Sequence, residues 1–404
     1  MPDISRTPAT ASKPPVITNG YSLSRKLALL ALAVTALVLI ITAGDGTKTT
    51  LLALGILLGI TLFHGSVSFT AAYRKLILFG DGRAVQAQLL MIALATLLFA
   101  PALAQGELFG QPIYGALAPV GVQVACGAFI FGIGMQLAGG CGSGTLYTAG
   151  SGNLKMLLVL ICFCAGSFWG SLDMSWWRQL PNVPAISLGQ EFGWITATVV
   201  QLTILLTLAW LIAKFGHTSK SVEQPLVTGS GWKWQRLISG PWPLVAAALI
   251  LALLNFATLS QAGHPWTITW AFSLWGAKTA SLVGWVPDPG SFWTAPFQSS
   301  ALSGSILQDT TSVMNIGLLL GAFIASILAG RLGSKGPAAI KPYIAAIIGG
   351  LLLGYGARIA YGCNIGALFS GIASSSLHGW LWIAAALPGN WLGVKLRPWF
   401  GLRN

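Results

Sequence analysis

Long segments with almost no charge recur along the whole chain, and they constrain its fold more than any other feature. Each is close to the roughly 20 apolar residues that a helix needs to cross a bilayer. Only 8% of the 404 residues are charged, whereas soluble proteins carry about a quarter. So few charges cannot cover a soluble surface of this size. The sequence therefore predicts an all-α polytopic membrane protein and excludes an ordinary soluble enzyme.

Ten such segments predict about ten spans, with short broken or re-entrant helices between them. The predicted spans cover residues 27–43, 50–63, 84–104, 116–138, 154–172, 192–213, 243–260, 312–330, 343–359 and 376–394. The second is short, so we expect it to continue as a broken helix through 66–79. The Trp- and Pro-rich stretch 264–300 is interpreted as re-entrant. Residues 1–26 lack apolar periodicity and are predicted to form a disordered cytoplasmic tail, followed by a single transmembrane domain over 27–404.

The charge balance of the chain indicates topology. The net charge is +13, but the basic residues are scattered between the apolar segments, so they do not predict a nucleic-acid partner. With the N-terminus inside, all but four of the 22 basic residues fall on the inner side. The exceptions are Lys48, Arg178, Lys278 and Arg358. Both termini are therefore predicted to be cytoplasmic.

One motif occurs twice. Residues 132–146 recur as 354–368, where glycines and one cysteine match at an offset of 222, and after one inserted residue the match continues through 374–393. Five predicted spans separate the copies, so the copies enter the membrane from opposite sides. This predicts an inverted pseudo-two-fold repeat with halves at about 50–213 and 243–394. Glycine-broken helices at this depth are tolerated where they line a cavity, which indicates a solute pathway.

The repeated cysteines, Cys141 and Cys363, are the central candidates for binding. Neutral thiols offer soft, weak contacts, which suit a sulfur-containing anion better than a hard cation. The starts of broken helices add partial positive charge. The residues around the cysteines complete the candidate set, and Lys278 is a weaker candidate. These neighbours are Gly140, Gly362 and Asn364.

Arg358 lies five residues before Cys363, within a predicted span, and Gln136 is its repeat counterpart. A charge inside the membrane is expensive, so it is a functional candidate by default. We interpret Arg358 as attracting an anion. A structural pairing with carbonyls, or a side chain that reaches the interface, are the alternatives. None of the five cysteines has zinc or iron–sulfur spacing, so no metal or cofactor is expected.

The two motifs, Leu-Ala-Gly-Gly-Cys141 and Gly354-Tyr-Gly-Ala-Arg-Ile-Ala-Tyr-Gly-Cys363-Asn-Ile-Gly, resemble the YeeE/YedE sulphur-transport family. The resemblance implies a bacterial inner-membrane importer of thiosulfate with an hourglass-shaped helical fold. It also implies that cysteines contact the anion in turn along a central path. Two of them match Cys141 and Cys363, whereas Ser68 stands where the family has its third cysteine. A cytoplasmic sulfur carrier of the TusA type is the partner that the resemblance implies.

Alternative functions remain open. Since a hydroxyl cannot replace the soft contact of a thiol, the serine at position 68 leaves another sulfur or selenium oxyanion as a possible substrate. A membrane-embedded enzyme could use the two cysteines for thiol or sulfur transfer, and a cation or metal transporter could use them as thiolates. The cysteine motif has no carboxylate or histidine in either copy, 132–146 or 354–368, and contains Arg358 in the second. It therefore favours an anion transporter, and no enzymatic activity is expected.

Overall fold

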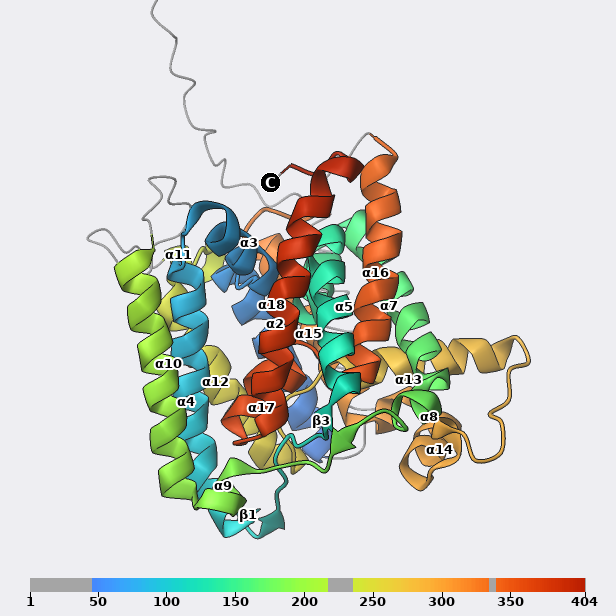
Figure 1. The fold of residues 1–404 in the computed structure, drawn as a ribbon. Coiled ribbons are helices and arrows are strands. Elements are labelled where there is room, and N and C mark those ends of the chain that lie inside the picture. The colour runs from blue at the N-terminus through green and yellow to red at the C-terminus, as the bar shows by residue number, and fades with distance from the viewer. Residues whose placement is uncertain (1–45, 217–234, 334–338, 404) are drawn as a thin grey trace, which may run out of the picture.

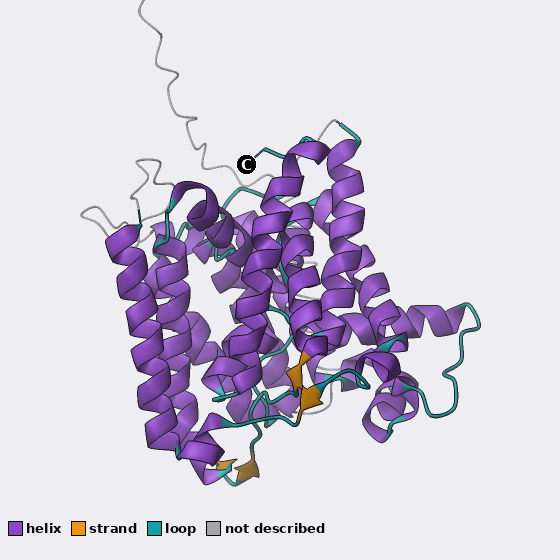
Figure 2. Cartoon of the chain, in the orientation of Figure 1, coloured by secondary structure: helices purple, strands orange, loops and turns teal. Residues whose placement is uncertain are grey.

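The computed structural model describes residues 46–216, 235–333 and 339–403, which form a bundle of long helices (Figure 1). The predicted tail 1–26 and first span 27–43 lie outside the described residues. Two small antiparallel pairs of strands sit at the lower end of the bundle in Figure 2. They are β1 (Glu107–Leu108) with β2 (Gln111–Pro112), and β3 (Val120–Gly121) with β4 (Asn182–Val183). The described residues contain eight helical segments long and apolar enough to cross a membrane, which confirms the predicted class.

Each predicted span from 50–63 onward coincides with a long helix, although the last, 376–394, is not among the eight segments that are long and apolar enough to cross a membrane. These helices are α2 (Gly46–Gly65), α4 (Arg83–Gln105), α5 (Val122–Ala138), α7 (Leu154–Leu172), α10 (Trp194–Phe215), α12 (Leu244–Ala262), α15 (Thr310–Leu328), α16 (Lys341–Ile359) and α18 (Leu377–Leu396). The largest difference is at α5, which begins later than the predicted 116. Pro119 and the pairing of β3 with β4 keep the preceding residues extended.

Three of the long helices are followed by a break and a short helix. The short helices are α3 (Phe69–Phe79) after α2, α6 (Gly142–Gly150) after α5, and the π-helical η3 (Asn364–Phe369) with α17 (Ser370–Ala373) after α16. The broken helix predicted after 50–63 is thus observed. The other short elements connect the bundle: α8 (Met174–Trp177), α9 (Leu188–Phe192), α11 (Gln235–Ser239), α13 (Thr269–Leu282), η1 (Phe292–Thr294), α14 (Pro296–Ser303), η2 (Ile306–Gln308) and η4 (Arg397–Phe400).

The stretch interpreted as re-entrant contains α13, which lies across the bundle rather than along it (Figure 1). Its 14 residues span about 21 Å at 1.5 Å per residue, less than the roughly 30 Å of a bilayer core. The chain then continues through η1 and α14 at the same end of the molecule, so α13 does not cross the bundle.

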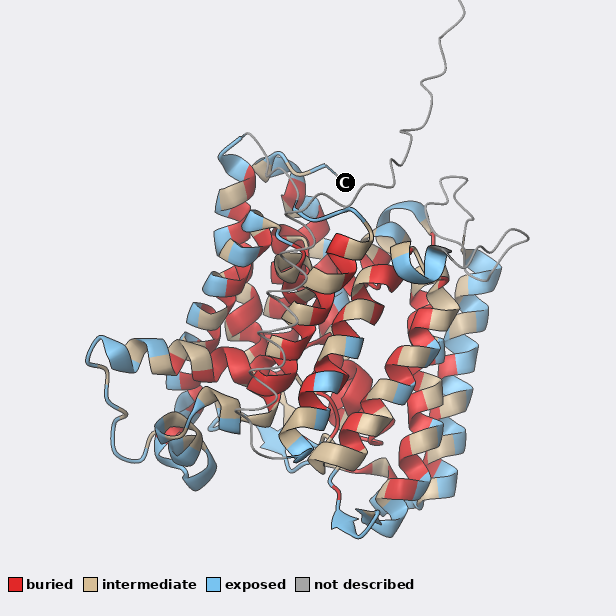
Figure 3. Cartoon of the chain, turned by 180° about the vertical axis from the view of Figure 1, so that it is seen from behind, coloured by how far each residue is buried: buried red, intermediate tan, exposed pale blue. Residues whose placement is uncertain are grey.

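Glycines bring the central helices together. In Figure 3 the buried residues gather on the inner faces of the long helices, where α5, α7, α16 and α18 pack on one another. A Cβ on Gly134 of α5 would lie 2.8 Å from the backbone nitrogen of Leu353, and one on Gly356 of α16 would lie 2.7 Å from that of Phe131. Since 131 and 353 are also related by 222, the two helices exchange equivalent contacts. Backbone approach this close requires glycine.

Candidate functional site

Three helix starts carry a capping side chain that sequence analysis singled out. Ser68 caps α3, Cys141 caps α6 and Cys363 caps η3. The Ser68 hydroxyl accepts from Ala71 N at 3.2 Å, the Cys141 thiol from Gly144 N at 3.4 Å, and the Cys363 thiol from Ile365 N at 3.5 Å. Each of these atoms therefore stands at the positive end of a helix, where a negative group is stabilised.

The two cysteine breaks meet in the core. Cys141 and Cys363 are both buried, with 1% and 0% of their surface exposed. A Cβ on Gly142, the residue after Cys141, would lie 3.1 Å from the Cys363 Sγ. The absence of a side chain at Gly142 therefore lets the start of α6 lie against the second thiol. Residues separated by 222 positions in the chain thus form one local site.

Polar groups without partners surround these cysteines. Both amide atoms of Asn364 and the Thr145 hydroxyl are buried and make no close hydrogen bond among the described residues, and the Tyr73 side chain lies next to the Asn364 amide. An unsatisfied buried polar group costs about 1–3 kcal/mol. Such groups are rare in folded proteins and mark positions that a polar ligand or water would stabilise. Sequence analysis predicted Asn364 as a binding residue but did not predict Thr145, although Thr145 lies within the repeated motif 132–146.

Gly140 and Gly362 precede the two cysteines and allow the chain to turn tightly over the following helix. A Cβ at Gly140 would lie 3.2 Å from the Thr145 hydroxyl, and one at Gly362 would lie 2.8 Å from Ala367 N. Both glycines thus hold the backbone over the first turn of the next helix. Side chains at these positions would displace the cysteine breaks.

Arg358 lines a cavity of about 300 Å³ together with Thr267, Trp270 and Tyr361. Its guanidinium lies 4.8 Å from the centre of the Phe292 ring, and its Nε has no partner among the described residues. An adjoining cavity of about 180 Å³ shares Thr267 and Tyr361 and also touches Gly366, three residues after Cys363. Together these spaces form a vestibule on the η3 side of the cysteines.

Sequence analysis missed Tyr361 and Thr267, which these cavities share together with His264. Tyr361 has a backbone φ of 58°, a left-handed conformation that is uncommon for a residue with a large side chain. Local strain of this kind clusters at functional sites. Nothing in the sequence around Tyr361 signals that conformation, because it arises from the fold of the whole break.

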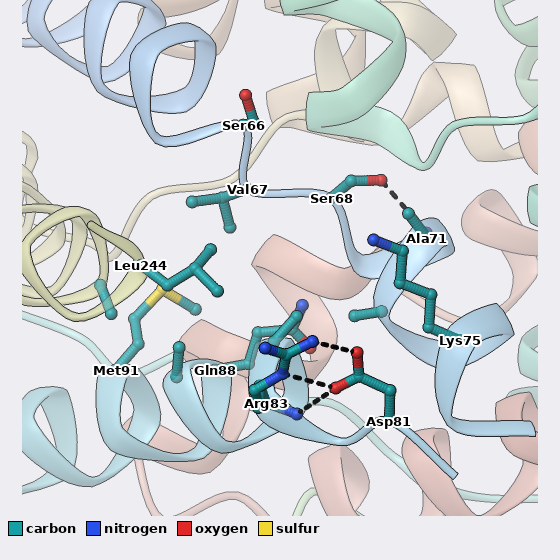
Figure 4. Close-up of a pocket in the computed structure, with 14 residues that line it drawn as sticks. Ser66, Val67, Ser68, Ala71, Lys75, Asp81, Arg83, Gln88, Met91 and Leu244 are labelled. Atoms are coloured by element: carbon teal, nitrogen blue, oxygen red, sulfur yellow. Dashed lines mark hydrogen bonds and ion pairs between the residues drawn. The ribbon is translucent and has the colours of Figure 1, made fainter. Parts of the chain in front are cut away.

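Ser68 lies at a second cavity, of about 100 Å³, at the end of the bundle where α3 meets α4. Lys75, Asp81 and Arg83 also line this space (Figure 4). The Arg83 guanidinium donates to both carboxylate oxygens of Asp81. These hydrogen bonds hold the pKa of the Asp81 carboxyl below its usual range. In Figure 1 this end of the molecule is opposite the end that carries α13 and α14.

Gln136 and Lys278 have structural partners. The Gln136 amide donates to Thr70 O at 3.1 Å and to Asn390 Oδ1 at 2.8 Å, which links α5 to α3 and α18. The Lys278 ammonium donates to the carbonyls of Leu302 and Gly304 at 2.7 and 2.6 Å. Lys278 therefore attaches α13 to the end of α14 rather than contacting either cysteine break.

Comparison with known proteins identifies the family of this chain. The family model described as sulphur transport matches residues 64–392, most of the chain. The chain belongs to the sulphur transport family. Within this family, thiosulfate transporter TsuA of Spirochaeta thermophila is 28% identical over 352 residues, which cover 84% of this chain and 96% of the relative.

Two further members of the sulphur transport family come from Escherichia coli. Thiosulfate transporter TsuA is 25% identical over 368 residues, covering 85% of this chain and 94% of the relative. Probable transporter YedE is 33% identical over 162 residues, which cover 40% of this chain and 39% of that protein. The predicted family is confirmed, and its members that match most of this chain are named as transporters.

Proposed function

We propose that this protein imports thiosulfate, or a closely related sulfur-containing anion, along a path through Cys141 and Cys363. The observation that carries the proposal is the meeting of two thiol-capped helix starts beside the unpartnered amide of Asn364. Thiols give soft contacts to the terminal sulfur, while helix ends and amide hydrogens stabilise the oxygens. The names of the relatives support this substrate and favour transport over catalysis.

The path runs between the two cavity systems. The anion enters the vestibule beside Arg358 and Tyr361, passes the cysteines, and leaves through the cavity at Ser68. An arginine at the vestibule raises the local anion concentration. Each thiol binds weakly enough to release the anion again, as conduction through a series of sites requires.

An inverted repeat would place these cavities on opposite sides of the membrane. Helix direction supports this repeat. In Figure 1, α5 leads upward from β3, whereas α16, which is its repeat counterpart, and α7 run downward. The exchange of packing partners also supports it: α5 packs on α18, and its counterpart α16 packs on α7. This relation is the packing expected when two copies of one unit are joined by a two-fold axis.

The membrane potential limits how far the anion can accumulate inside the cell. Moving a dianion inward against about 100 mV, negative inside, costs roughly 4.6 kcal/mol at about 2.3 kcal/mol per charge. Passive flow therefore cannot concentrate the anion. We place the protein in the bacterial inner membrane with both termini cytoplasmic, where a TusA-type sulfur carrier would consume the imported anion and maintain the gradient.

Uptake of radiolabelled thiosulfate into proteoliposomes tests this function. We expect Cys141→Ala and Cys363→Ala to lower the uptake rate at least about tenfold, equivalent to 1.4 kcal/mol. Cys126→Ala, a half-buried cysteine of α5, is the matched control and keeps the wild-type rate. If both central variants transport at the wild-type rate, the cysteine path is wrong. Competition by sulfate, sulfite and selenate then identifies the preferred anion.

A further inference from the structure

The cavity at the α2–α3 break combines features that the cysteine path does not use. It holds about 100 Å³, whereas a single water needs about 10–15 Å³ by the same measure. The space therefore admits several waters or one compact tetrahedral anion. Its walls come from the break itself, from α3, α4 and α12, and from the turn that carries Asp81 before Arg83 begins α4.

The charges around this cavity do not balance. Lys75 and Arg83 contribute two positive charges and Asp81 one negative charge, which leaves one positive charge in excess. Arg83 holds Asp81 through Nε to Oδ1 at 3.0 Å and Nη2 to Oδ2 at 2.6 Å. Within residues 46–216, 235–333 and 339–403, this is the ion pair that the structure contains. In Figure 4 the Lys75 side chain extends from α3 toward Ser68.

We propose that this cavity is a second oxyanion-binding site, in which the anion competes with the Asp81 carboxylate for the Arg83 guanidinium. This inference rests on the proposed function and names the site from which the anion leaves. A guanidinium binds carboxylates and tetrahedral oxyanions through the same two-pronged geometry. The internal carboxylate therefore occupies the donors that the anion needs.

Two neighbouring groups fit an anion in this cavity. The Ser68 oxygen already accepts from Ala71 N, so its own proton can be donated into the cavity. The side chain of Gln88 is 4% exposed, and its Oε1 has no partner among the described residues. Gln88 lines the cavity, and its amide carries an NH₂ group that can donate to an anion.

Competition with Asp81 makes this a weak site, which matches a role in release. An anion that arrives from the cysteines must displace the Asp81 carboxylate. Asp81 is only two residues from Arg83 in the chain, so its carboxylate stays close to the guanidinium. When the anion leaves, the carboxylate pairs with the guanidinium again, so Arg83 does not stay without a counter-charge. A site that binds too tightly would stop conduction.

Equilibrium binding of radiolabelled thiosulfate to the purified protein in low-salt detergent solution tests the proposal. A Cys141→Ala/Cys363→Ala background removes the thiol contacts, so the remaining binding reports on this cavity. We expect Asp81→Asn in this background to tighten binding at least about fivefold and Arg83→Gln to abolish it. Lys214→Gln is the control, because Lys214 is a cation at the same end of the molecule that stacks on Trp210.

The outcomes separate this site from the cysteine path. If Asp81→Asn fails to tighten binding, if Arg83→Gln binds as Lys214→Gln does, or if no variant binds thiosulfate, the proposed site is wrong. Loss of uptake in the two cysteine variants would still support the transport function in each of these cases. Thermal unfolding of each variant establishes that it is folded before binding is measured.

Discussion

At the scale of residues, position 364 combines complete burial with unsatisfied polarity. Asn364 is 0% exposed, and neither atom of its amide makes a close hydrogen bond among the described residues. Asn390 is equally buried, but it accepts from Gln136 and donates to Ala386 O. Asn364 is therefore the candidate for binding, whereas Asn390 has a structural role.

We predict opposite effects when each asparagine is replaced by leucine. Asn364→Leu removes a buried amide whose desolvation is not offset by a close hydrogen bond. The unfolding temperature is therefore expected to stay the same or rise. Its rate of thiosulfate uptake is expected to fall at least about tenfold, which corresponds to a loss of about 1.4 kcal/mol of binding free energy. Asn390→Leu should lower the free energy of unfolding by about 1–3 kcal/mol. Thermal unfolding and proteoliposome uptake check both variants, and wild-type uptake by Asn364→Leu would contradict the assigned role.

The Asp81–Arg83 pair carries a prediction about pH. Because the pKa of Asp81 is lowered in the folded protein by its hydrogen bonds to Arg83, the pair contributes stability above the unfolded-state pKa of about 3.9. That contribution, below about 1 kcal/mol for an ion pair near the surface, is lost as the pH falls through the folded-state pKa. The difference in unfolding free energy between wild type and Asp81→Asn should persist from pH 7 to about pH 5 and decrease progressively as the pH falls below the unfolded-state pKa of about 3.9. If the difference in unfolding free energy already disappears at neutral pH, it arises from a group other than Asp81.

At the scale of elements, backbone contacts between helices determine how the breaks are held. Gly354 of α16 faces α7, where a Cβ would collide with Phe163 O and Ser167 N. Gly132 of α5 faces α18 in the equivalent way, with Ala386 O and Asn390 N as the obstructing atoms. Both contacts lie within three turns of a cysteine break, so any separation of these helices moves the thiols.

We predict that Gly354→Ala lowers the free energy of unfolding by about 1–3 kcal/mol, because the new methyl group overpacks the contact between α16 and α7. Gly46→Ala is the matched control, since a Cβ there meets nothing within 4 Å. Its effect should be neutral or slightly stabilising. Thermal unfolding in detergent measures both variants, and equal stability of the two would show that the helices can separate without cost.

At the scale of the whole molecule, the two cavity systems should open on opposite sides of the membrane. In a cysteine-free protein, we predict that Thr267→Cys and Lys75→Cys react with a membrane-impermeant maleimide from opposite sides of sealed vesicles. Phe109→Cys and Lys214→Cys mark the two ends of the molecule, because Phe109 lies in the exposed turn after α4 and Lys214 at the end of α10. Labelling of both cavity positions from the same side would contradict an inverted arrangement.

The sequence by itself determined the membrane class, the bounds of most long helices and the family. These depend on local apolarity and on a motif of residues that are close together in the chain. It also identified the residues at the cysteine breaks, since glycines and cysteines repeated at one offset cannot arise from composition alone. Only the tertiary structure decided what each polar residue contacts. Lys278 is held by the carbonyls of Leu302 and Gly304, and Tyr361 lines the vestibule. Such contacts join residues distant in the chain, so they follow from the packing of helices rather than from any local pattern.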